Sequence, residues 1–245
     1  MIAGKTILVT GATSGIGQAT ARHFNSCGAA VVMVARSEDK LKDMVAEFNG
    51  KGYIYPADLG ALENVEKIFA FCKEKGLKLD GVVHCAGITA NLPLRVNDIQ
   101  CMEELMRINF ESLVQICKFA SSKRYTNDGA SIVAMSSTAS FCGDRGLSLY
   151  SASKGAVNTF VKAAAKELVT RRIRVNAIAP TMVNTNMCAE TFRDLPERRI
   201  SLERELPLGI IEPEYIAYLA EYLISDKAKY ITGSIITMGS GLIVQ

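Results

Sequence analysis

Short apolar runs rich in β-branched residues recur along the chain and alternate with longer segments of helical periodicity. In a helical segment near the start, for example, one face would carry Ile16, Ala19, Thr20, His23 and Phe24. Alternation of strands and helices predicts a parallel sheet with helices on both faces, because right-handed crossovers place each helix over the sheet. We therefore expect an α/β chain, doubly wound, with about seven strands at residues 6–10, 30–34, 53–55, 81–83, 131–135, 174–178 and 234–238.

The alternation of predicted strands and helices is interrupted once, by a polar and charged segment at about residues 182–208. A connection this long in a compact fold usually serves as a lid or a binding segment. It follows the sixth predicted strand, at the edge where parallel sheets bind ligands. No Pro/Gly/Ser-rich linker, repeat or low-complexity tract divides the chain, so we expect one domain over residues 1–245 with a substrate loop at 182–208.

Composition and charge narrow the class of protein. The chain of 245 residues is 49% hydrophobic and 22% charged, which excludes a disordered or collagen-like chain. No apolar run approaches the roughly 18 residues that a membrane-spanning helix needs, and the segment at Gly4-Lys5 is unlike a signal peptide. The formal charge of +3 comes from scattered residues. We therefore expect a cytoplasmic protein with no nucleic-acid or membrane partner.

The cysteines do not follow the spacing of a metal or disulfide framework. There are seven, with no C-x-x-C pair, and only His23 and His84 could assist them as ligands. The interpretation is a set of reduced thiols, and no metal site is expected. The cysteines are Cys27, Cys72, Cys85, Cys101, Cys117, Cys142 and Cys188.

A glycine-rich turn, T-G-A-T-S-G-I-G at residues 10–17, follows the first strand and opens a helix. Glycine is required where a backbone turns sharply, approaches a phosphate or packs closely on a strand. The free N–H groups and the dipole of the helix N-terminus favour a pyrophosphate. In the first strand-to-helix turn of a doubly wound fold, this pattern predicts dinucleotide binding.

The spacing T-G-x-x-x-G-x-G resembles that of the short-chain dehydrogenase/reductase family. The resemblance extends from Lys5 to Gly241. Its further matches are Asp58-Leu59, Ala86-Gly87, Asn109, Ser137, Tyr150-x-x-x-Lys154 and Thr232-Gly233. It implies a single Rossmann domain, an NAD(P)-dependent oxidoreductase activity and a homo-oligomer, either a dimer or a tetramer.

The same resemblance, together with the glycine turn, implies which residues bind the cofactor. They come from the loops that follow successive strands, and two come from the Tyr-Lys pair. They are Gly11, Thr13, Ser14, Gly15, Ile16, Gly17, Arg36, Asp58, Leu59, Ala86, Gly87, Tyr150, Lys154, Pro180, Met182, Val183 and Thr185.

The end of the second strand bears on the choice between NAD and NADP. A carboxylate there would accept hydrogen bonds from a ribose 2′-hydroxyl and repel a 2′-phosphate. This chain has Ala35 at that position and then Arg36, a permanent cation suited to phosphate. NADP(H) is therefore favoured, with NAD(H) still possible, because many NADP-type members also carry a basic residue where this chain has Ser14.

Four residues are candidates for catalysis. Tyr150 and Lys154 lie four residues apart and so share a helix face. A nearby ammonium and the positive nicotinamide of the cofactor would lower the tyrosine pKa from about 10 towards the working range, so that Tyr150 exchanges a proton with the substrate oxygen. Ser137 would hydrogen-bond that oxygen. The resemblance implies that Lys154 also holds the nicotinamide ribose, and that Asn109 holds a water in a proton relay.

Three positions depart from the family pattern. His84-Cys85 stands where many members have Asn-Asn, so an amide that braces the fourth strand is missing. We expect Cys85 to be a small packing residue and His84 to be buried or on the cofactor side. Thr181 replaces a glycine near the nicotinamide, and Gly239-Ser240 replaces the first two residues of a D/N-G-G motif.

The leading hypothesis is an NADP(H)-dependent oxidoreductase acting on a carbonyl or secondary alcohol. One alternative is specifically a 3-oxoacyl-(acyl-carrier-protein) reductase, in which Arg171 and Arg172 would receive an acidic carrier; cations at a helix C-terminus are equally explained by the dipole. Another is a dinucleotide-sensing protein without turnover. An extended epimerase or dehydratase matches the glycine spacing and the length poorly. The substrate is therefore left open as a small or an acyl-carrier-bound carbonyl compound.

Overall fold

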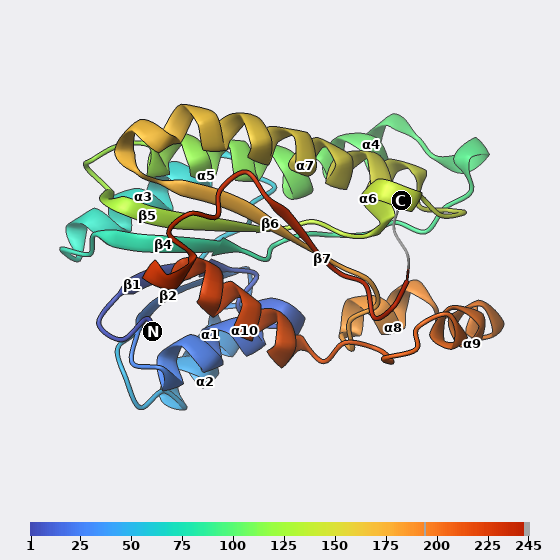
Figure 1. Ribbon diagram of the computed structural model, residues 1–245, viewed down its shortest axis with the longest axis horizontal. Helices are drawn as coiled ribbons and strands as arrows, with labels where there is room; N and C mark the ends of the chain where they lie inside the picture. Colours follow the sequence, from blue (N-terminus) through green and yellow to red (C-terminus); the bar gives the residue numbers. More distant parts are fainter. Residues whose placement is uncertain (194, 243–245) are drawn as a thin grey trace.

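The computed structural model describes residues 1–193 and 195–242, and its centre is one parallel seven-stranded sheet. The order across the sheet is β3-β2-β1-β4-β5-β6-β7 (Figure 1). Each predicted strand is present, and most are longer than expected by one to five residues. The strands are β1 (Thr6–Thr10), β2 (Ala30–Ala35), β3 (Gly52–Pro56), β4 (Leu79–His84), β5 (Thr126–Met135), β6 (Arg174–Pro180) and β7 (Ile235–Met238).

Helices cover both faces of the sheet, which confirms the doubly wound architecture (Figure 1). One layer consists of α1 (Gly15–Ser26), α2 (Glu38–Ala46) and α10 (Pro213–Ile224), and the other of α3 (Glu63–Glu74), α5 (Ser112–Ala120) and α7 (Ser148–Leu168). Shorter helices lie towards the ends of the strands. They are α4 (Ile99–Met106), α6 (Ala139–Cys142), α8 (Asn186–Thr191) and α9 (Pro196–Arg204).

Two hydrophobic cores result, because successive side chains of a strand point to opposite faces. Leu8 of β1 belongs to the core under α3, α5 and α7, whereas Ile7 and Val9 belong to the core under α1, α2 and α10. The apolar stripe predicted for α1 is confirmed in part. Phe24 is fully buried, but His23 is only half-buried, at the contact between α1 and α10.

The connections of the sheet place the site. The chain moves outward from β1 to β2 and β3, and then returns to add β4 on the other side of β1. The loops after β1 and β4 therefore diverge at a topological switch point, where doubly wound sheets bind ligands. They touch there, since a Cβ added to Gly11 would lie 2.9 Å from the Ala86 nitrogen.

Two further segments contribute to this edge. Between α4 and α5, residues Arg107–Glu111 form a π-helical turn, a feature often found at functional sites. The predicted substrate loop at 182–208 contains α8 and α9; Asp194 within it, like residues 243–245 of the predicted domain, lies outside the described residues. Among the helices described, none is long and apolar enough to cross a membrane.

Candidate active site

A cavity of about 700 Å³ lies at the carboxyl edge of the sheet, a size typical of small-molecule sites. Every residue predicted to bind the cofactor lines it, as does Ser137; Asn109, the fourth candidate for catalysis, does not. The cavity extends from Arg36 after β2 to the substrate loop, where residues that sequence reasoning did not single out contribute. These are chiefly Met187, Cys188, Phe192, Leu202 and Leu206.

The glycine turn is packed too closely to accept any other residue at Gly17. A Cβ there would lie 2.2 Å from the Gly11 carbonyl oxygen, and one on Gly15 would lie 2.9 Å from the Thr185 methyl group. Ser14 is the N-cap of α1 in an extended conformation, and its side chain makes no capping hydrogen bond. The first N–H groups of α1 therefore have no side-chain cap, and because residues 14–17 line the cavity, the positive end of the helix dipole lies at it, which suits a pyrophosphate.

The end of β2 presents cations to the cavity. Arg36 and Lys40 are both exposed and line it, and Ser37 between them caps α2 by accepting a hydrogen bond from the Lys40 backbone. Lys40 was not identified from the sequence as a cofactor-binding residue, although its position four residues after Arg36 could have indicated it. Together the Arg36 and Lys40 side chains provide positive charge at this end of the cavity, where Ser14 stands in place of a basic residue.

Tyr150 and Lys154 lie on one face of α7, as their spacing predicted. The Lys154 ammonium is 5.7 Å from the centroid of the Tyr150 ring and donates a hydrogen bond of 2.9 Å to the Met135 carbonyl at the end of β5. Lys154 is only 4% exposed, so its charge acts within a poorly solvated environment. Helix α7 thus presents a phenol and an ammonium to the same end of the cavity.

The pKa values of the pair differ from the sequence-based expectation. Burial lowers the pKa of Lys154 to about 8. Burial raises the pKa of Tyr150, and the Ser137 side chain offsets part of that rise. The expected lowering of the tyrosine pKa is absent from the chain alone, where the effect of burial dominates and the positive nicotinamide is not present. Near neutral pH the phenol therefore keeps its proton, as a general acid must.

The loop carrying Ser137 is held by a buried network. Ser136 donates to the Asn158 side-chain oxygen at 2.6 Å, and the Asn158 amide donates to the Ser140 hydroxyl at 2.7 Å. Ser140 in turn donates to the Ser137 carbonyl at 2.5 Å. These bonds connect α7 to the loop after β5, so the helix that carries Tyr150 also fixes the position of Ser137.

Asn109 lies beside the cavity without lining it. Its side-chain oxygen accepts a 2.8 Å hydrogen bond from the Ile88 N–H, and its amide donates to the Ile88 carbonyl at 3.0 Å and the Ser153 hydroxyl at 3.0 Å. A Cβ on Gly87 would come within 3.2 Å of the Asn109 oxygen and 3.4 Å of the Lys154 ammonium. Asn109 therefore fixes the loop after β4 directly behind the buried lysine.

The amide that braces β4 in many members is missing, as the sequence indicated, and the imidazole of His84, buried as predicted, takes its place. Its Nδ1 lies 2.8 Å from the Thr10 hydroxyl, and its Nε2 lies 3.0 Å from the Ser112 hydroxyl. Ser112 donates to the Ile108 carbonyl, so it accepts from Nε2–H, and Thr10 donates to Nδ1. Burial and the Lys154 charge lower the pKa of His84 to about 3, so the ring is neutral.

The other departures from the family pattern are accommodated differently. Cys85 lines the cavity, and burial raises the pKa of its thiol to about 12, so it is no thiolate. Thr181 also lines the cavity, and its N–H donates to the Met238 carbonyl at 3.0 Å. Ser240, where a glycine is expected, has φ of 49°, a left-handed conformation that is costly for a residue with a Cβ.

The substrate loop is tied to its neighbours across the cavity. Arg198 of α9 forms an ion pair with Asp144, and the Asn91 amide donates to the Thr191 carbonyl at 3.2 Å. Among the described residues that line the cavity, the basic ones are Arg36, Lys40 and Lys154. The described residues that the substrate loop contributes to the lining are mainly apolar, and the charged one among them is an acid, Glu205.

Of the two arginines that follow α7, Arg171 is hydrogen-bonded within the fold. The Arg171 guanidinium donates to Asp128 at 2.7 Å and to the Ser121 and Thr126 carbonyls at 2.9 and 3.0 Å. These contacts hold the start of β5 and leave little of Arg171 for an acidic carrier. Arg172 is exposed and ends the helical segment in a left-handed conformation.

A doubly wound parallel sheet, a glycine turn at its switch point and a Tyr-Lys pair beside a serine loop define the class of short-chain oxidoreductases. Residues 11–243 match the family model described as enoyl-(acyl carrier protein) reductase. The 3-oxoacyl-(acyl-carrier-protein) reductase FabG of Thermotoga maritima is 33% identical, over 98% of each chain. The chain belongs to the short-chain dehydrogenase/reductase family.

Other relatives and solved structures agree on the family and differ in their named substrates. The 3beta-hydroxysteroid dehydrogenase 1 of Eggerthella lenta is 32% identical, over 98% of this chain and 94% of its own. A short-chain type dehydrogenase/reductase from Mycobacterium ulcerans has a TM-score of 0.91 at 29% identity, covering 98% and 90% of the two chains. A gluconate 5-dehydrogenase-like protein of Beutenbergia cavernae, solved with bound NADP, has a TM-score of 0.89 at 29% identity, covering 98% and 97%.

Proposed function

We propose that this protein is an NADP(H)-dependent oxidoreductase that acts on a carbonyl or secondary alcohol, with Tyr150 as the general acid and base. The observation that carries the proposal is that Ser137, Tyr150 and Lys154 line the same cavity as the glycine turn. On family resemblance we also propose a single domain, a cytoplasmic location and a homo-oligomer, either a dimer or a tetramer.

Each residue has a distinct part in the proposed reaction. The bound nicotinamide supplies or accepts the hydride. Ser137 donates a hydrogen bond to the substrate oxygen, where negative charge develops during reduction. Tyr150, whose pKa is raised by burial, is protonated near neutrality and delivers its proton to that oxygen. Lys154 holds positive charge beside the phenol and stabilises the phenolate left behind.

Replacing Tyr150 by Phe tests the assignment of the proton donor. Removing the hydroxyl leaves the ring in place, so we expect turnover to fall by about 10²–10⁴-fold while NADPH binding persists. NADPH oxidation against a panel of ketones and fluorescence titration of NADPH measure the two effects. Tyr230→Phe, at a residue 91% exposed, is the matched control. Turnover retained by Tyr150→Phe would refute the role.

The preference for NADP(H) is supported by Arg36, Lys40 and the absence of a carboxylate at Ala35. In Arg36→Asp, the new carboxylate would repel a 2′-phosphate and accept hydrogen bonds from a 2′-hydroxyl. We expect NADPH affinity to fall by about 10- to 100-fold, equivalent to losing one charge-assisted hydrogen bond, and NADH use to rise. Lys51→Asp controls for the charge change. An unchanged preference would place the phosphate elsewhere.

The substrate is best sought among apolar carbonyl compounds, because the substrate loop contributes Met187, Phe192, Leu202 and Leu206 to the cavity. The relatives named as acyl-carrier-protein reductases keep a carrier-bound 3-oxoacyl chain as a candidate. Rates with a 3-oxoacyl chain on its carrier and with free apolar ketones distinguish the two. NADPH binding without turnover on any of these substrates would instead favour a dinucleotide sensor.

A further inference from the structure

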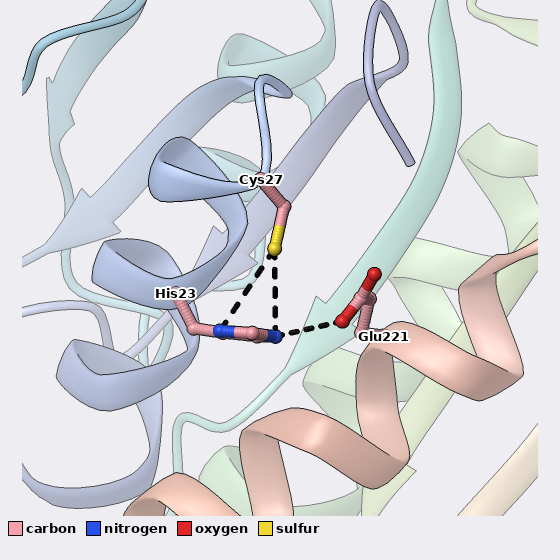
Figure 2. A group of neighbouring side chains, drawn as sticks. All are labelled: His23, Cys27 and Glu221. Atoms are coloured by element: carbon pink, nitrogen blue, oxygen red, sulfur yellow. Dashed lines mark hydrogen bonds and ion pairs between the residues drawn. The ribbon is translucent and has the colours of Figure 1, made fainter. Parts of the chain in front are cut away.

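Three side chains of different chemistry converge where α1 meets α10, away from the cavity described above. His23 lies in the last turn of α1, Cys27 is the C-cap of that helix, and Glu221 lies on α10 (Figure 2). Their ligand atoms all lie within 4.8 Å of one another. The proposed oxidoreductase reaction uses none of these residues.

The contacts within this cluster are direct. His23 Nε2 is 2.8 Å from a Glu221 carboxylate oxygen, and Cys27 Sγ is 3.7 Å from the same nitrogen (Figure 2). The edge of the Tyr218 ring packs on His23 with centroids 4.9 Å apart, which restricts the imidazole. His23 also lines a surface groove with Arg22, Ser26 and Tyr218, so an ion has access from solvent.

We propose that His23, Cys27 and Glu221 form a binding site for Zn²⁺. Imidazole nitrogen, thiolate sulfur and carboxylate oxygen are the ligand types that Zn²⁺ takes in proteins, whereas Mg²⁺ and Ca²⁺ prefer oxygen alone. Bond lengths of about 2.0–2.3 Å imply ligand separations of roughly 3.3–3.7 Å around a tetrahedral ion. The 3.7 Å sulfur–nitrogen separation is of this size, but Sγ also lies 3.9 Å from Nδ1, so the imidazole must turn to direct Nε2 at an ion shared with the sulfur. The 2.8 Å nitrogen–oxygen separation must widen by about 0.5 Å.

The local electrostatics support a cation at this place. The C-terminal end of α1 carries the negative end of the helix dipole, and Glu221 adds a full negative charge. The opposing charges are the N-terminal ammonium of Met1, 3.6 Å from Glu221, and the Arg22 guanidinium in the same groove, which is paired with Glu47. Burial and Glu221 raise the pKa of the Cys27 thiol, so zinc binding releases its proton and forms the sulfur–zinc bond.

The sequence could not predict this site. His23 and Cys27 have the i, i+4 spacing that places two ligands on one helix face, but that spacing occurs widely without a metal. The third ligand comes from a helix 198 residues further along, and only the packing of α1 on α10 brings it there. An ion bound here would join these two helices, which cover the same face of the sheet.

The test is a zinc titration of the full chain after treatment with a chelator, followed with a chromophoric zinc indicator and by thermal unfolding. We expect one equivalent to bind and to raise the Tm. Cobalt in place of zinc should give a thiolate-to-cobalt charge-transfer absorption. Cys27→Ser and His23→Gln should each weaken zinc binding by at least about tenfold and remove the Tm shift. Cys101→Ser, on α4, is the matched control.

Three results would overturn the proposal: no stoichiometric zinc binding, binding that Cys27→Ser leaves unchanged, or a cobalt complex without the thiolate absorption. If the His23–Glu221 contact only stabilises the fold, His23→Gln should lower the Tm by the same amount with and without zinc. Circular dichroism and NADPH oxidation establish that Cys27→Ser is folded, since Cys27 lies outside the cavity.

Discussion

At the scale of single residues, His84 joins three segments at the carboxyl edge of the sheet. Through its two ring nitrogens it connects the Thr10 hydroxyl of β1 with the Ser112 hydroxyl of α5. The Thr10 hydroxyl also accepts a hydrogen bond of 3.2 Å from the Ala86 N–H. A neutral ring is essential to this arrangement, because a protonated one has no acceptor for Thr10.

The low pKa of His84 predicts a defined dependence of stability on pH. In the unfolded chain the ring gains its proton below about pH 6.5, whereas in the folded chain it does so only near pH 3. Stability is therefore present above pH 6.5 and is lost as the pH falls towards 3, by up to about 1.4 kcal/mol per pH unit.

His84→Asn should weaken this dependence and cost about 1–3 kcal/mol at pH 7, because one buried hydroxyl loses its partner. Urea unfolding of both proteins between pH 7 and 4 measures the difference in slope. Equal slopes would show that His84 is not the buried neutral group.

Residue types and spacing were enough to predict the glycine turn and the Tyr150-Lys154 pair, since both depend on local geometry. Contacts across the fold were not predictable in this way. The sequence marks His84 as a departure from the family, but its partners Thr10 and Ser112 come from separate elements. Likewise, the direction of the Lys154 ammonium depends on a carbonyl of β5.

At the scale of elements, α7 and the loop after β5 act together. Asn158 lies one helical turn beyond Lys154 and reaches across to Ser136 and Ser140. The hydrogen bond to Ser136 is buried and the one to Ser140 is partly buried, and together they hold the loop that presents Ser137. Asn158 is a positioning residue, because it acts on Ser137 through this loop and does not line the cavity.

Asn158→Ala should lower kcat by about tenfold, which corresponds to about 1.4 kcal/mol of lost positioning in the transition state. The KM for NADPH should change little, because the glycine turn is remote from this loop. Steady-state kinetics separates the two parameters. Thr159→Ala, at the adjacent exposed position, is the control. A rise in KM for NADPH at unchanged kcat would contradict a role in positioning Ser137.

The elements themselves were largely predictable, and the exceptions have physical reasons. The strand positions were predictable from the apolar runs. β5, however, begins at Thr126, five residues before the predicted start, because hydrogen bonds from Asn127 and Arg171 hold its polar first residues. The π-helical turn around Asn109 could not be predicted, since its apolar spacing is that of an ordinary helix. The short helices α8 and α9 have too little apolar surface to define their ends.

At the scale of the whole molecule, the cavity crosses from the half of the sheet made by β1–β3 to the half that begins with β4. A dinucleotide bound along it would contact both halves. Saturating NADPH should therefore raise the stability of the whole chain, by about 2.7 kcal/mol at 100 times its Kd, in one cooperative transition. Calorimetry with and without NADPH measures this. Two separate transitions would show that the halves unfold independently.

The order of the strands also determines which strand pairs can form before the whole chain has been synthesised. β1 pairs with β2 soon after both are made, but its other edge pairs with β4, through partners such as Val9 and Val83. Until β4 emerges, the backbone N–H and C=O groups along that edge of β1 have no partner strand, and such edges attract other chains. Pairing across this separation is slow, because a long loop must close first. The switch point that creates the binding site thus makes the nascent chain prone to aggregation.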